Sequence, residues 1–317
     1  MDRSVCLQMT KAQIMASEAY KAIPAGYNKS KLNKGPLCDL LHQLLSPQQQ
    51  QRPSSPIRPV QQPQRPLSPV KPVQRRLSIA KRPFITSSSL VAKYPLTTKC
   101  HADWDKVIPF LFLQIEENKL PACIPQSEYG TLPLVVITLN PLTLEVDKAE
   151  VPPTLYDNIL NCKEPWVVVY ISIYGWVNEE TEKPTETGHA NILIINKERQ
   201  EMERFEPHGH ETYIYSAESM NAYFSNLAAL FGYKYISPLD YCPRGPQSRE
   251  AADAEIRRTC QSLGYCVAWS TMYALMRLLN PEYSREDVLA DIMKGTSQEL
   301  HIKARRFTAF MESVLPD

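Results

Sequence analysis

The order of apolar and polar positions is most informative between residues 264 and 281. From Val267 to Leu279 the chain is apolar on nearly every side, which is typical of a helix that is buried all round. Gly264 allows a tight turn into this segment, and Pro281 prevents the helix from continuing. The pattern therefore predicts a buried helix whose first turn contains Cys266.

A second pattern predicts a β-hairpin upstream of that helix. Residues 189–196 and 201–206 are rich in types that favour strands, and the polar tetrad 197–200 separates them. His189 begins the first of these strands, and Glu206 ends the second. Because the strands of a hairpin run in opposite directions, we expect both side chains at the same edge of the sheet, within reach of each other.

The rest of the chain after residue 90 alternates short apolar runs with amphipathic ones. Strands are expected at 133–140, 165–174 and 233–239, a helix or an irregular apolar segment at 101–121, and helices at 217–232, 285–295 and 298–315. Helices that flank a small, mostly antiparallel sheet place this region in the α+β class.

The chain before residue 90 has a different composition. Residues 1–45 contain two short helical patterns joined by a lysine-rich connection, which predict a small helical hairpin. This hairpin resembles the SAP-type modules of large DNA viruses, which bind DNA, although a docking hairpin with solvated lysines explains the pattern equally well. Residues 46–89 are rich in Pro, Gln, Ser and Arg and predict a disordered linker. Residues 90–317 are expected to form the globular domain.

The linker carries a strong positive charge. Between residues 46 and 83 there are eight basic residues, nine prolines and no acidic residue, so neither a helix nor an interior strand is expected. A segment with this charge attracts polyanions, which makes nucleic acid or a capsid protein a candidate partner. The alternative is a plain solvated tether.

Composition sets wider limits on the whole chain. Its 317 residues suffice for a substantial core, and a formal net charge of +1 implies no global electrostatic partner. No run of about eighteen apolar residues occurs, and the start of the chain has no signal-type apolar segment, so we expect a soluble cytoplasmic protein without membrane contact. The eight cysteines show no CxxC pair and no metal-ligand spacing. We expect them to be reduced thiols, and we expect no metal or other cofactor.

The candidate chemistry is that of a cysteine peptidase. This reaction needs a thiolate, an imidazole, a group that orients the imidazole, and donors for the oxyanion. Cys266 lies at a helix N-terminus, where unpaired N–H groups and the helix dipole favour a thiolate. His189 and Glu206 supply the imidazole and the acid, and Gln247, at the end of an apparent strand, supplies an oxyanion donor. The competing interpretation of Cys266 is a small packed hydrophobe.

Two segments of the chain resemble a known group of proteases. Residues 188–209 and 264–281 are similar to the adenovirus maturation protease and, more distantly, to the SUMO and ubiquitin-like-specific proteases. They look closer still to uncharacterised homologues in giant and other large DNA viruses. The resemblance implies the fold of the adenovirus protease, with His189, Glu206 and Cys266 as the catalytic triad. The chain order of His, acid, Gln and Cys in this group is the reverse of the order in papain.

Two departures from the group's pattern concern the substrate and the oxyanion donor. In the SUMO proteases Trp follows the catalytic His and Gly follows the Cys, whereas Ala190 and Val267 stand here, which alters the groove for a diglycine tail. The group's glutamine lies a few residues before the cysteine, a spacing that Gln261 matches. The sequence around Gln247 resembles the context of that glutamine, so we favour Gln247 and treat residues 248–263 as an insertion.

The resemblance covers roughly residues 165–281 and implies a function. It implies a viral maturation-type peptidase that cleaves polypeptides through a thioacyl-enzyme, in the host cytoplasm or virus factory and in the virion. Two alternatives stay open, an isopeptidase that removes ubiquitin-like modifiers and an inactive protease-fold scaffold of the virion. The sequence indicates no oligomeric state.

The other candidate residues are less suited to chemistry. His208 and His210 have no cysteine or carboxylate at metal spacing, so a zinc site is not expected. Cys242 and Cys260 are alternative thiols, but neither begins an apolar helix. His301 is expected to be a solvated histidine on a basic helix.

Overall fold

The computed structural model describes residues 82–125, 135–152, 154–175, 188–260 and 264–314. All of them belong to one of the two units into which the chain divides, Leu77–Asp317. The predicted helical hairpin, the linker up to residue 81 and the alternative glutamine Gln261 lie outside the described residues.

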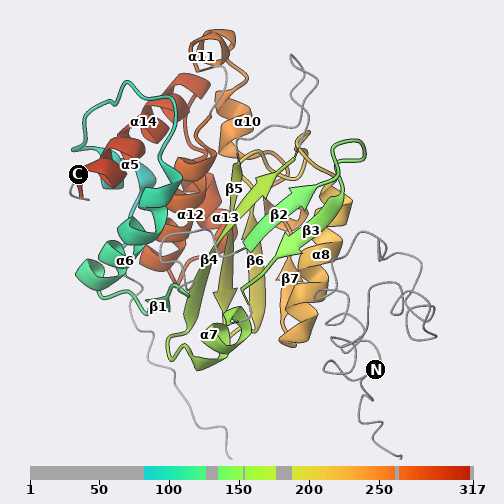
Figure 1. Ribbon diagram of the computed structural model, residues 1–317. Helices are drawn as coiled ribbons and strands as arrows, with labels where there is room; N and C mark the ends of the chain where they lie inside the picture. Colours follow the sequence, from blue (N-terminus) through green and yellow to red (C-terminus); the bar gives the residue numbers. More distant parts are fainter. Residues whose placement is uncertain (1–81, 126–134, 153, 176–187, 261–263, 315–317) are drawn as a thin grey trace, which may run out of the picture. The chain divides into compact units, whose positions relative to one another are not determined.

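Seven described strands form one sheet, drawn at the centre of Figure 1. Its order is β3-β2-β4-β5-β6-β7, with β1 paired to β4 off this path. The strands are β1 (Ala122–Cys123), β2 (Val135–Leu139), β3 (Val146–Glu150), β4 (Trp166–Tyr174), β5 (His189–Asn196), β6 (Glu201–Phe205) and β7 (Lys234–Ile236).

The sheet is mixed, so the expectation of a small, mostly antiparallel sheet is confirmed only in part. The pairs β2–β3, β4–β5 and β5–β6 are antiparallel, whereas β1–β4, β2–β4 and β6–β7 are parallel. The sequence predicts the hairpin of β5 and β6 because only the polar tetrad 197–200 separates the two strands. The parallel pairs were missed because each depends on a crossover connection whose return position no local pattern specifies.

Ten helices accompany the sheet in the part of the chain that the structure describes, together with the 3-10 helix η2 (Trp104–Lys106). They are α5 (Ser87–Val91), α6 (Val107–Asn118), α7 (Leu155–Asn161), α8 (Ala217–Leu230), α9 (Pro238–Tyr241), α10 (Pro246–Glu250), α11 (Ala254–Thr259), α12 (Cys266–Leu279), α13 (Arg285–Ile292) and α14 (Ser297–Ser313). Serine caps begin two of these helices, since the hydroxyls of Ser216 and Ser284 accept hydrogen bonds from the first turns of α8 and α13. The α+β class is therefore correct.

Both faces of the sheet are covered, which explains why β4 and the middle of β5, residues 192–195, are apolar at successive positions. Alternate side chains of these strands, such as Val168 and Ile192, pack with α6, α12, α13 and α14 in one core. The residues between them, such as Val169 and Leu193, pack with α7 and α8 in a second core. Figure 1 shows α12 and α14 on one side of the sheet and α8 on the other.

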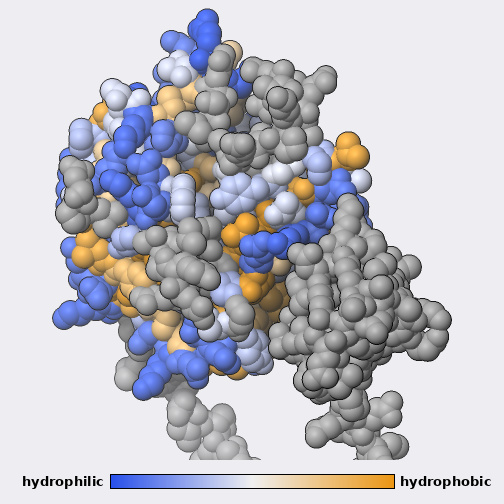
Figure 2. All heavy atoms as spheres, viewed as in Figure 1, coloured by the Kyte–Doolittle hydropathy of each residue, from blue (hydrophilic) through white to orange (hydrophobic). Residues whose placement is uncertain are grey.

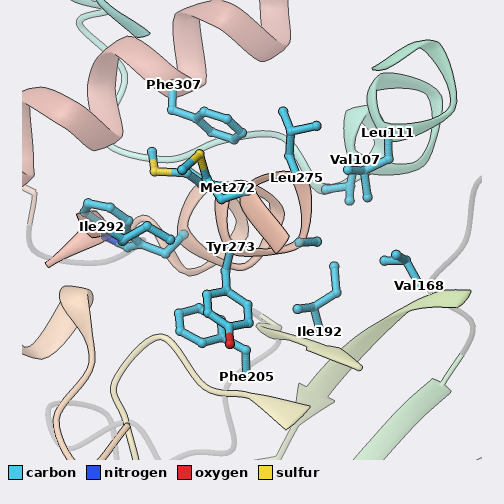
Figure 3. Packing of buried hydrophobic residues seen from close by; sticks show 14 of the residues in the cluster. Val107, Leu111, Val168, Ile192, Phe205, Met272, Tyr273, Leu275, Ile292 and Phe307 are labelled. Atoms are coloured by element: carbon cyan, nitrogen blue, oxygen red, sulfur yellow. The ribbon is translucent and has the colours of Figure 1, made fainter. Parts of the chain in front are cut away.

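Helix α12 occupies the middle of the first core. Figure 3 looks along this helix, with Phe307 of α14 on one side, Val107 of α6 on another, and Ile192 and Phe205 of the sheet below. All but its second and last residues are buried, which confirms the predicted all-round apolar helix. Because contacts surround α12, the position of its first residue, Cys266, is fixed by the core.

The globular unit begins earlier than the predicted boundary at residue 90. The backbone N–H of Ser87 donates to Asp291 Oδ2 at 2.6 Å, and that of Ile85 donates to Asn280 Oδ1 at 2.8 Å. Residues 82–89 were assigned to the linker because they follow its prolines directly. Their partners lie about two hundred residues away, so no local pattern reveals the contact.

Four of the cysteines form disulfides, which corrects the expectation of thiols throughout. Cys100 pairs with Cys260, and Cys123 pairs with Cys162. The Cα–Cα distances of 5.2 and 6.2 Å lie in the usual range for disulfides, although the sequence separations are 160 and 39 residues. These pairs show no spacing motif because only the fold brings them together. Among the described cysteines, Cys242 and Cys266 are free.

The surface of the described unit is mixed in character. Helix α11, at the top of the view, presents mainly hydrophilic residues, whereas the turn between β2 and β3 has a hydrophobic tip (Figure 2). None of the described helices combines the length and the apolar character that crossing a membrane requires.

Candidate active site

The hairpin of β5 and β6 brings His189 and Glu206 together. His189 is the first residue of β5, and Glu206 directly follows the last residue of β6. The His189 Nε2 and Glu206 Oε1 atoms are 2.7 Å apart, and the two side chains are only 3% and 0% exposed. The expected meeting of these residues at one edge of the sheet is thus present.

Cys266 reaches the same edge from the other direction. It begins α12, which packs against β5, and the hydroxyl of Ser270 one turn later donates to the Ala190 carbonyl at 3.1 Å. This bond ties the first turns of α12 to the residue after His189. The Cys266 side chain interacts with the His189 imidazole and contributes to raising its pKa. The imidazole therefore lies between a thiol and a carboxylate.

Four donors surround the Glu206 carboxylate. Its Oε1 accepts from His189 and from the backbone N–H of His208, the latter at 2.8 Å. Its Oε2 accepts from Asn191 Nδ2 at 2.7 Å and from the Tyr215 hydroxyl. Burial alone would raise the pKa of Glu206, but the charge and hydrogen bond of His189 and the other donors lower it to about 2. Glu206 is therefore held as a carboxylate.

The buried Arg204 holds the two side chains, Asn191 and Tyr215, that donate to Glu206 Oε2. Arg204 Nη1 donates to Asn191 Oδ1 at 2.7 Å and to the Tyr215 hydroxyl at 2.6 Å. Its other nitrogens donate to Tyr235 and Asn221, both at 2.9 Å. This network fixes the orientation of the two side chains that hold Glu206 Oε2.

Sequence reasoning missed this supporting network, although the strand period contains a signal for it. Asn191 lies two residues after His189, and Arg204 lies two residues before Glu206. Residues two apart on a strand share a face. Polar residues at these two positions therefore mark the face on which the carboxylate is held.

The same partners set the charge of His189. Burial disfavours the protonated imidazole, but the Glu206 carboxylate and the hydrogen bonds with Cys266 and Glu206 outweigh it and raise the pKa of His189 to about 10. The imidazole is therefore protonated at neutral pH.

His208 lies beside the His189–Glu206 pair, but its ring is near Ser248. Its ring centroid is 5.3 Å from that of His189, and its Nδ1 is 3.2 Å from Ser248 Oγ. Burial and the neighbouring His189 charge lower the pKa of His208 to about 4, so this ring is neutral. No group of three or more possible metal ligands occurs in the described part of the chain.

Gln247 lies close to the start of α12, but not at the end of a strand as expected. It is in the first turn of α10, because Pro246 occupies the first helical position, where proline favours a helix start. Its backbone N–H donates to the Pro207 carbonyl at 3.0 Å. Gly264 has a φ of +51°, and a Cβ atom there would lie only 2.3 Å from Gln247 Nε2. Glycine at this position, two residues before Cys266, therefore leaves room for the Gln247 amide.

A close approach of two loops fixes the glutamine relative to the acid. The loop after β6 and the loop before α10 contact each other through their backbones, and Gly245 N–H donates to the His208 carbonyl at 2.8 Å. A Cβ atom at Gly245 would lie 2.1 Å from the Pro207 oxygen, and one at Gly209 would lie 2.5 Å from Gly245 N. Only glycine fits at both positions, so the spacing between Glu206 and Gln247 is built into the backbone.

The remaining sequence candidates lie outside this arrangement. Burial raises the pKa of the Cys242 thiol far above its usual range, and Cys260 is bonded to Cys100. The expectation of a solvated His301 is wrong, because its Nδ1 is 2.7 Å from Glu250 Oε1. The partner comes from α10, so the basic pattern of α14 alone could not reveal it.

Comparisons with known proteins add little to this geometry. No family model matches the chain, and no curated protein matches it. Among solved structures, the crystal structure of the Legionella pneumophila effector protein RavZ is similar over 62% of each chain, at 9% identity and a TM-score of 0.22. A similarity this low carries no argument about fold or function. The candidate site therefore depends on its own residues and distances.

Proposed function

We propose that this protein is a cysteine peptidase in which Cys266 is the nucleophile, His189 the acid and base, and Glu206 the orienting carboxylate. The observation that carries the proposal is the position of the His189 imidazole, which is 2.7 Å from Glu206 and interacts with Cys266 at the first turn of a buried helix. A nucleophile, a base and a group that orients the base are the parts that this reaction needs.

The first half of the reaction forms a thioester. The thiolate of Cys266 attacks the carbonyl carbon of the substrate, and the electron pair of the carbonyl moves onto its oxygen. When that oxyanion collapses, the C–N bond breaks and His189 donates its proton to the departing amine. Glu206 keeps the imidazole in place and stabilises its charged form without taking the proton.

The second half restores the enzyme. A water molecule gives a proton to the neutral His189 and attacks the thioester carbon. The C–S bond then breaks, which releases a carboxylic acid and returns Cys266 as a thiolate beside the protonated His189. Both halves use the same imidazole, so one correctly placed histidine suffices.

The oxyanion requires donors at the start of α12. The backbone N–H groups in the first turn of a helix have no partner within it, and Cys266 contributes one of them. We assign the second donor to Gln247 Nε2, which lies beside Gly264, two residues before the nucleophile. The alternative donor Gln261 lies outside the described residues.

The substrate class is a polypeptide. The resemblance to the adenovirus maturation protease implies peptide-bond cleavage of the viral maturation type. Ala190 and Val267, which replace the Trp and Gly of the SUMO proteases, favour a peptide over a ubiquitin-like tail. The basic linker at 46–83 remains a proposed contact for nucleic acid or a capsid protein, separate from the chemistry.

The direct test is digestion of a proteome-derived peptide library by the full chain, with product identification by mass spectrometry. We expect Cys266→Ala to lower turnover by at least about 10⁴-fold, because no other group replaces the nucleophile. The matched control is Cys242→Ala, which removes the other free thiol among the described residues and should leave turnover nearly unchanged. Wild-type turnover by Cys266→Ala would refute the proposal. Labelling by a ubiquitin or SUMO vinyl sulfone would instead identify an isopeptidase.

A further inference from the structure

Another buried carboxylate lies on the helix that carries Gln247. Glu250 is the last residue of α10, and its side chain is only 5% exposed. Trp269 Nε1 donates to its Oε2 at 2.9 Å, and His301 Nδ1 lies 2.7 Å from its Oε1. The proposed reaction uses none of these three side chains. Because desolvation offsets much of what the partners of a buried charge contribute, stability alone is a weak explanation for such a residue.

The bond between Glu250 and Trp269 joins α10 to α12 one turn away from the proposed oxyanion donors. In α10, Glu250 follows Gln247 by three residues. In α12, Trp269 follows Cys266 by three residues. The Gln247 amide lies beside Gly264, two residues before α12, and the bond between Glu250 and Trp269 joins the two helices about one turn further along each.

The other oxygen of Glu250 also leads to the start of α12. The His301 ring, whose Nδ1 faces that oxygen, lies edge-on to the Tyr265 ring, with 5.6 Å between the centroids. Tyr265 directly precedes Cys266 in the chain. One carboxylate oxygen therefore contacts α12 directly and the other contacts it through one ring, on the two sides of the nucleophile in the sequence.

The Gln247 side chain depends on α10 for its position. Its Oε1 is buried and has no hydrogen-bond partner among the described residues, so that oxygen does not hold the amide in place. Helix α10 has only five residues, and a helix this short is not stable without contacts from outside. The amide is therefore held only as firmly as other elements hold α10.

The contacts of α10 fix it against three parts of the fold. At its start, the Gln247 N–H donates to the Pro207 carbonyl at 3.0 Å. Arg249 donates to two backbone carbonyls between α13 and α14 at 2.7 and 2.9 Å. Within the described ranges, the bond between Glu250 and Trp269 is the one side-chain hydrogen bond that joins α10 to α12. This bond therefore controls the spacing of the two helices that carry the proposed donors.

We infer that Glu250 is a positioning residue for the oxyanion site, and that its hydrogen bond to Trp269 keeps Gln247 Nε2 at the correct distance from the backbone N–H of Cys266. This inference rests on the proposed peptidase function, with Gln247 as a donor. An oxyanion forms in both halves of the reaction, and both donors must point at it. A shift of α10 relative to α12 separates the donors, so it slows the reaction without weakening substrate binding.

The test removes the hydrogen bond from each side in turn. Glu250→Leu keeps the approximate size of the side chain but removes the acceptor, and Trp269→Phe removes the donor while an aromatic ring stays in the core. We expect each change to lower kcat about 10-fold, which is less than the loss of about 10²- to 10³-fold for removal of a donor. KM should be nearly unchanged, because the oxyanion is absent from the bound substrate. The measurement is steady-state hydrolysis by the full chain of a peptide found in the library digest.

All variants are compared at a temperature where circular dichroism shows them folded. If Glu250→Leu does not fold, Trp269→Phe decides alone. The matched control is Tyr273→Phe, because the Tyr273 hydroxyl also donates from α12 to a buried glutamate, Glu203, but about two turns from Cys266. Its kcat should stay close to that of the wild type. An equal fall of kcat in Tyr273→Phe and Trp269→Phe would overturn the inference, because any loosening of α12 would then be enough.

Two further measurements distinguish the positioning role from general damage to the site. Alkylation of Cys266 by iodoacetamide forms no oxyanion, so its rate, followed by mass spectrometry of the peptide that contains Cys266, should be unchanged in Trp269→Phe. Gln247→Ala should lower kcat by about 10²- to 10³-fold. In that background Trp269→Phe should lower kcat no further, because the donor that it displaces is already absent.

Several results would overturn the positioning role while the peptidase function stands. They are unchanged kcat in Trp269→Phe, unchanged kcat in Gln247→Ala, slower alkylation of Cys266 in Trp269→Phe, and losses that multiply in the double variant. If the wild type cleaves no peptide at all, the proposed function fails and the positioning role fails with it.

Discussion

Glu203 and Glu206 lie three residues apart, one on β6 and one directly after it, and both are buried, yet their surroundings are opposite. Glu203 faces α12 and α13, where Arg277 Nη2 and Arg285 Nε lie 3.3 and 3.2 Å from its Oε2. Glu206 faces a histidine and three uncharged donor groups. The Glu203 carboxylate thus lies between two arginines, whereas the Glu206 carboxylate, a few residues further along, lies against an imidazole.

The difference shows what makes a buried carboxylate useful for catalysis. An arginine does not release its proton in a protein, so the pairs at Glu203 have fixed charge and can only hold α12 and α13 against the sheet. A histidine exchanges protons, so the pair at Glu206 can support a reaction in which the charge of the imidazole changes. Burial is common to both sites, and the partner decides between structure and chemistry.

The largest difference that we expect between substitutions of Glu206 and of Glu203 is in turnover. Glu206→Gln keeps the size of the side chain but removes the charge that stabilises protonated His189, and its amide can hold the wrong tautomer. We expect kcat to fall by about 10² to 10⁴-fold while some activity remains. The measurement is steady-state hydrolysis of a peptide found in the library digest.

Glu203→Gln is the comparison variant for this experiment. Its kcat, measured at a temperature where the variant is folded, should stay within a few-fold of the wild type. Equal losses of kcat in the two variants would mean that Glu206 has only the structural role that Glu203 has.

The next largest effect is the loss of folding stability when Glu203 is substituted. Glu203→Gln leaves Arg277 and Arg285 without their buried counter-charge, so the free energy of unfolding should fall by about 3–5 kcal/mol. Denaturant titration at one pH gives this value. Glu201→Gln is a matched control, because Glu201 also pairs with Arg285 but is 23% exposed, and it should cost less than about 1 kcal/mol. A cost at Glu203 as small as the cost at Glu201 would contradict the assignment of Glu203 to the core.

The smallest effect that we expect is in the pH dependence of the unfolding free energy. The pKa of Glu206 is lowered from 4.5 to about 2, so its contribution to stability is present above pH 4.5 and is lost as the pH falls toward 2. The pKa of His189 is raised from 6.5 to about 10, so its contribution is present below pH 6.5 and is lost as the pH rises toward 10. The difference in unfolding free energy between the wild type and Glu206→Gln should therefore be largest between pH 4.5 and 6.5. A difference that stays constant outside this window would show that the two residues do not form a charged pair.

The sequence predicts the wrong surroundings for Gln247 and His301 because its patterns describe only local preferences. Gln247 was expected at a strand end from its turn context, but Pro246 starts a helix there, and the glycine contacts with the next loop set the position of the amide. His301 was expected in solvent from the basic character of its helix, but Glu250 of another helix pairs with it. In each case a contact from a distant part of the chain outweighed the local pattern.

The sequence by itself determined the elements that carry the candidate chemistry. Alternation and turn residues were enough to predict the hairpin with His189 and Glu206 at one edge, and an apolar run between glycine and proline was enough to predict the helix that begins at Cys266. These features are local, because backbone periodicity and turn geometry act over a few residues.

Only the tertiary structure decided how those elements meet and what surrounds them. The mixed order of the strands, the two disulfides, the Arg204 network behind Glu206 and the partners of Glu203 all join residues far apart in the chain. Glu206 receives its histidine from the predicted hairpin, whereas Glu203 receives its two arginines from helices more than seventy residues along the chain. The physical reason is that the charge and donors around a buried group come from whichever elements pack on it, and packing is a property of the whole chain.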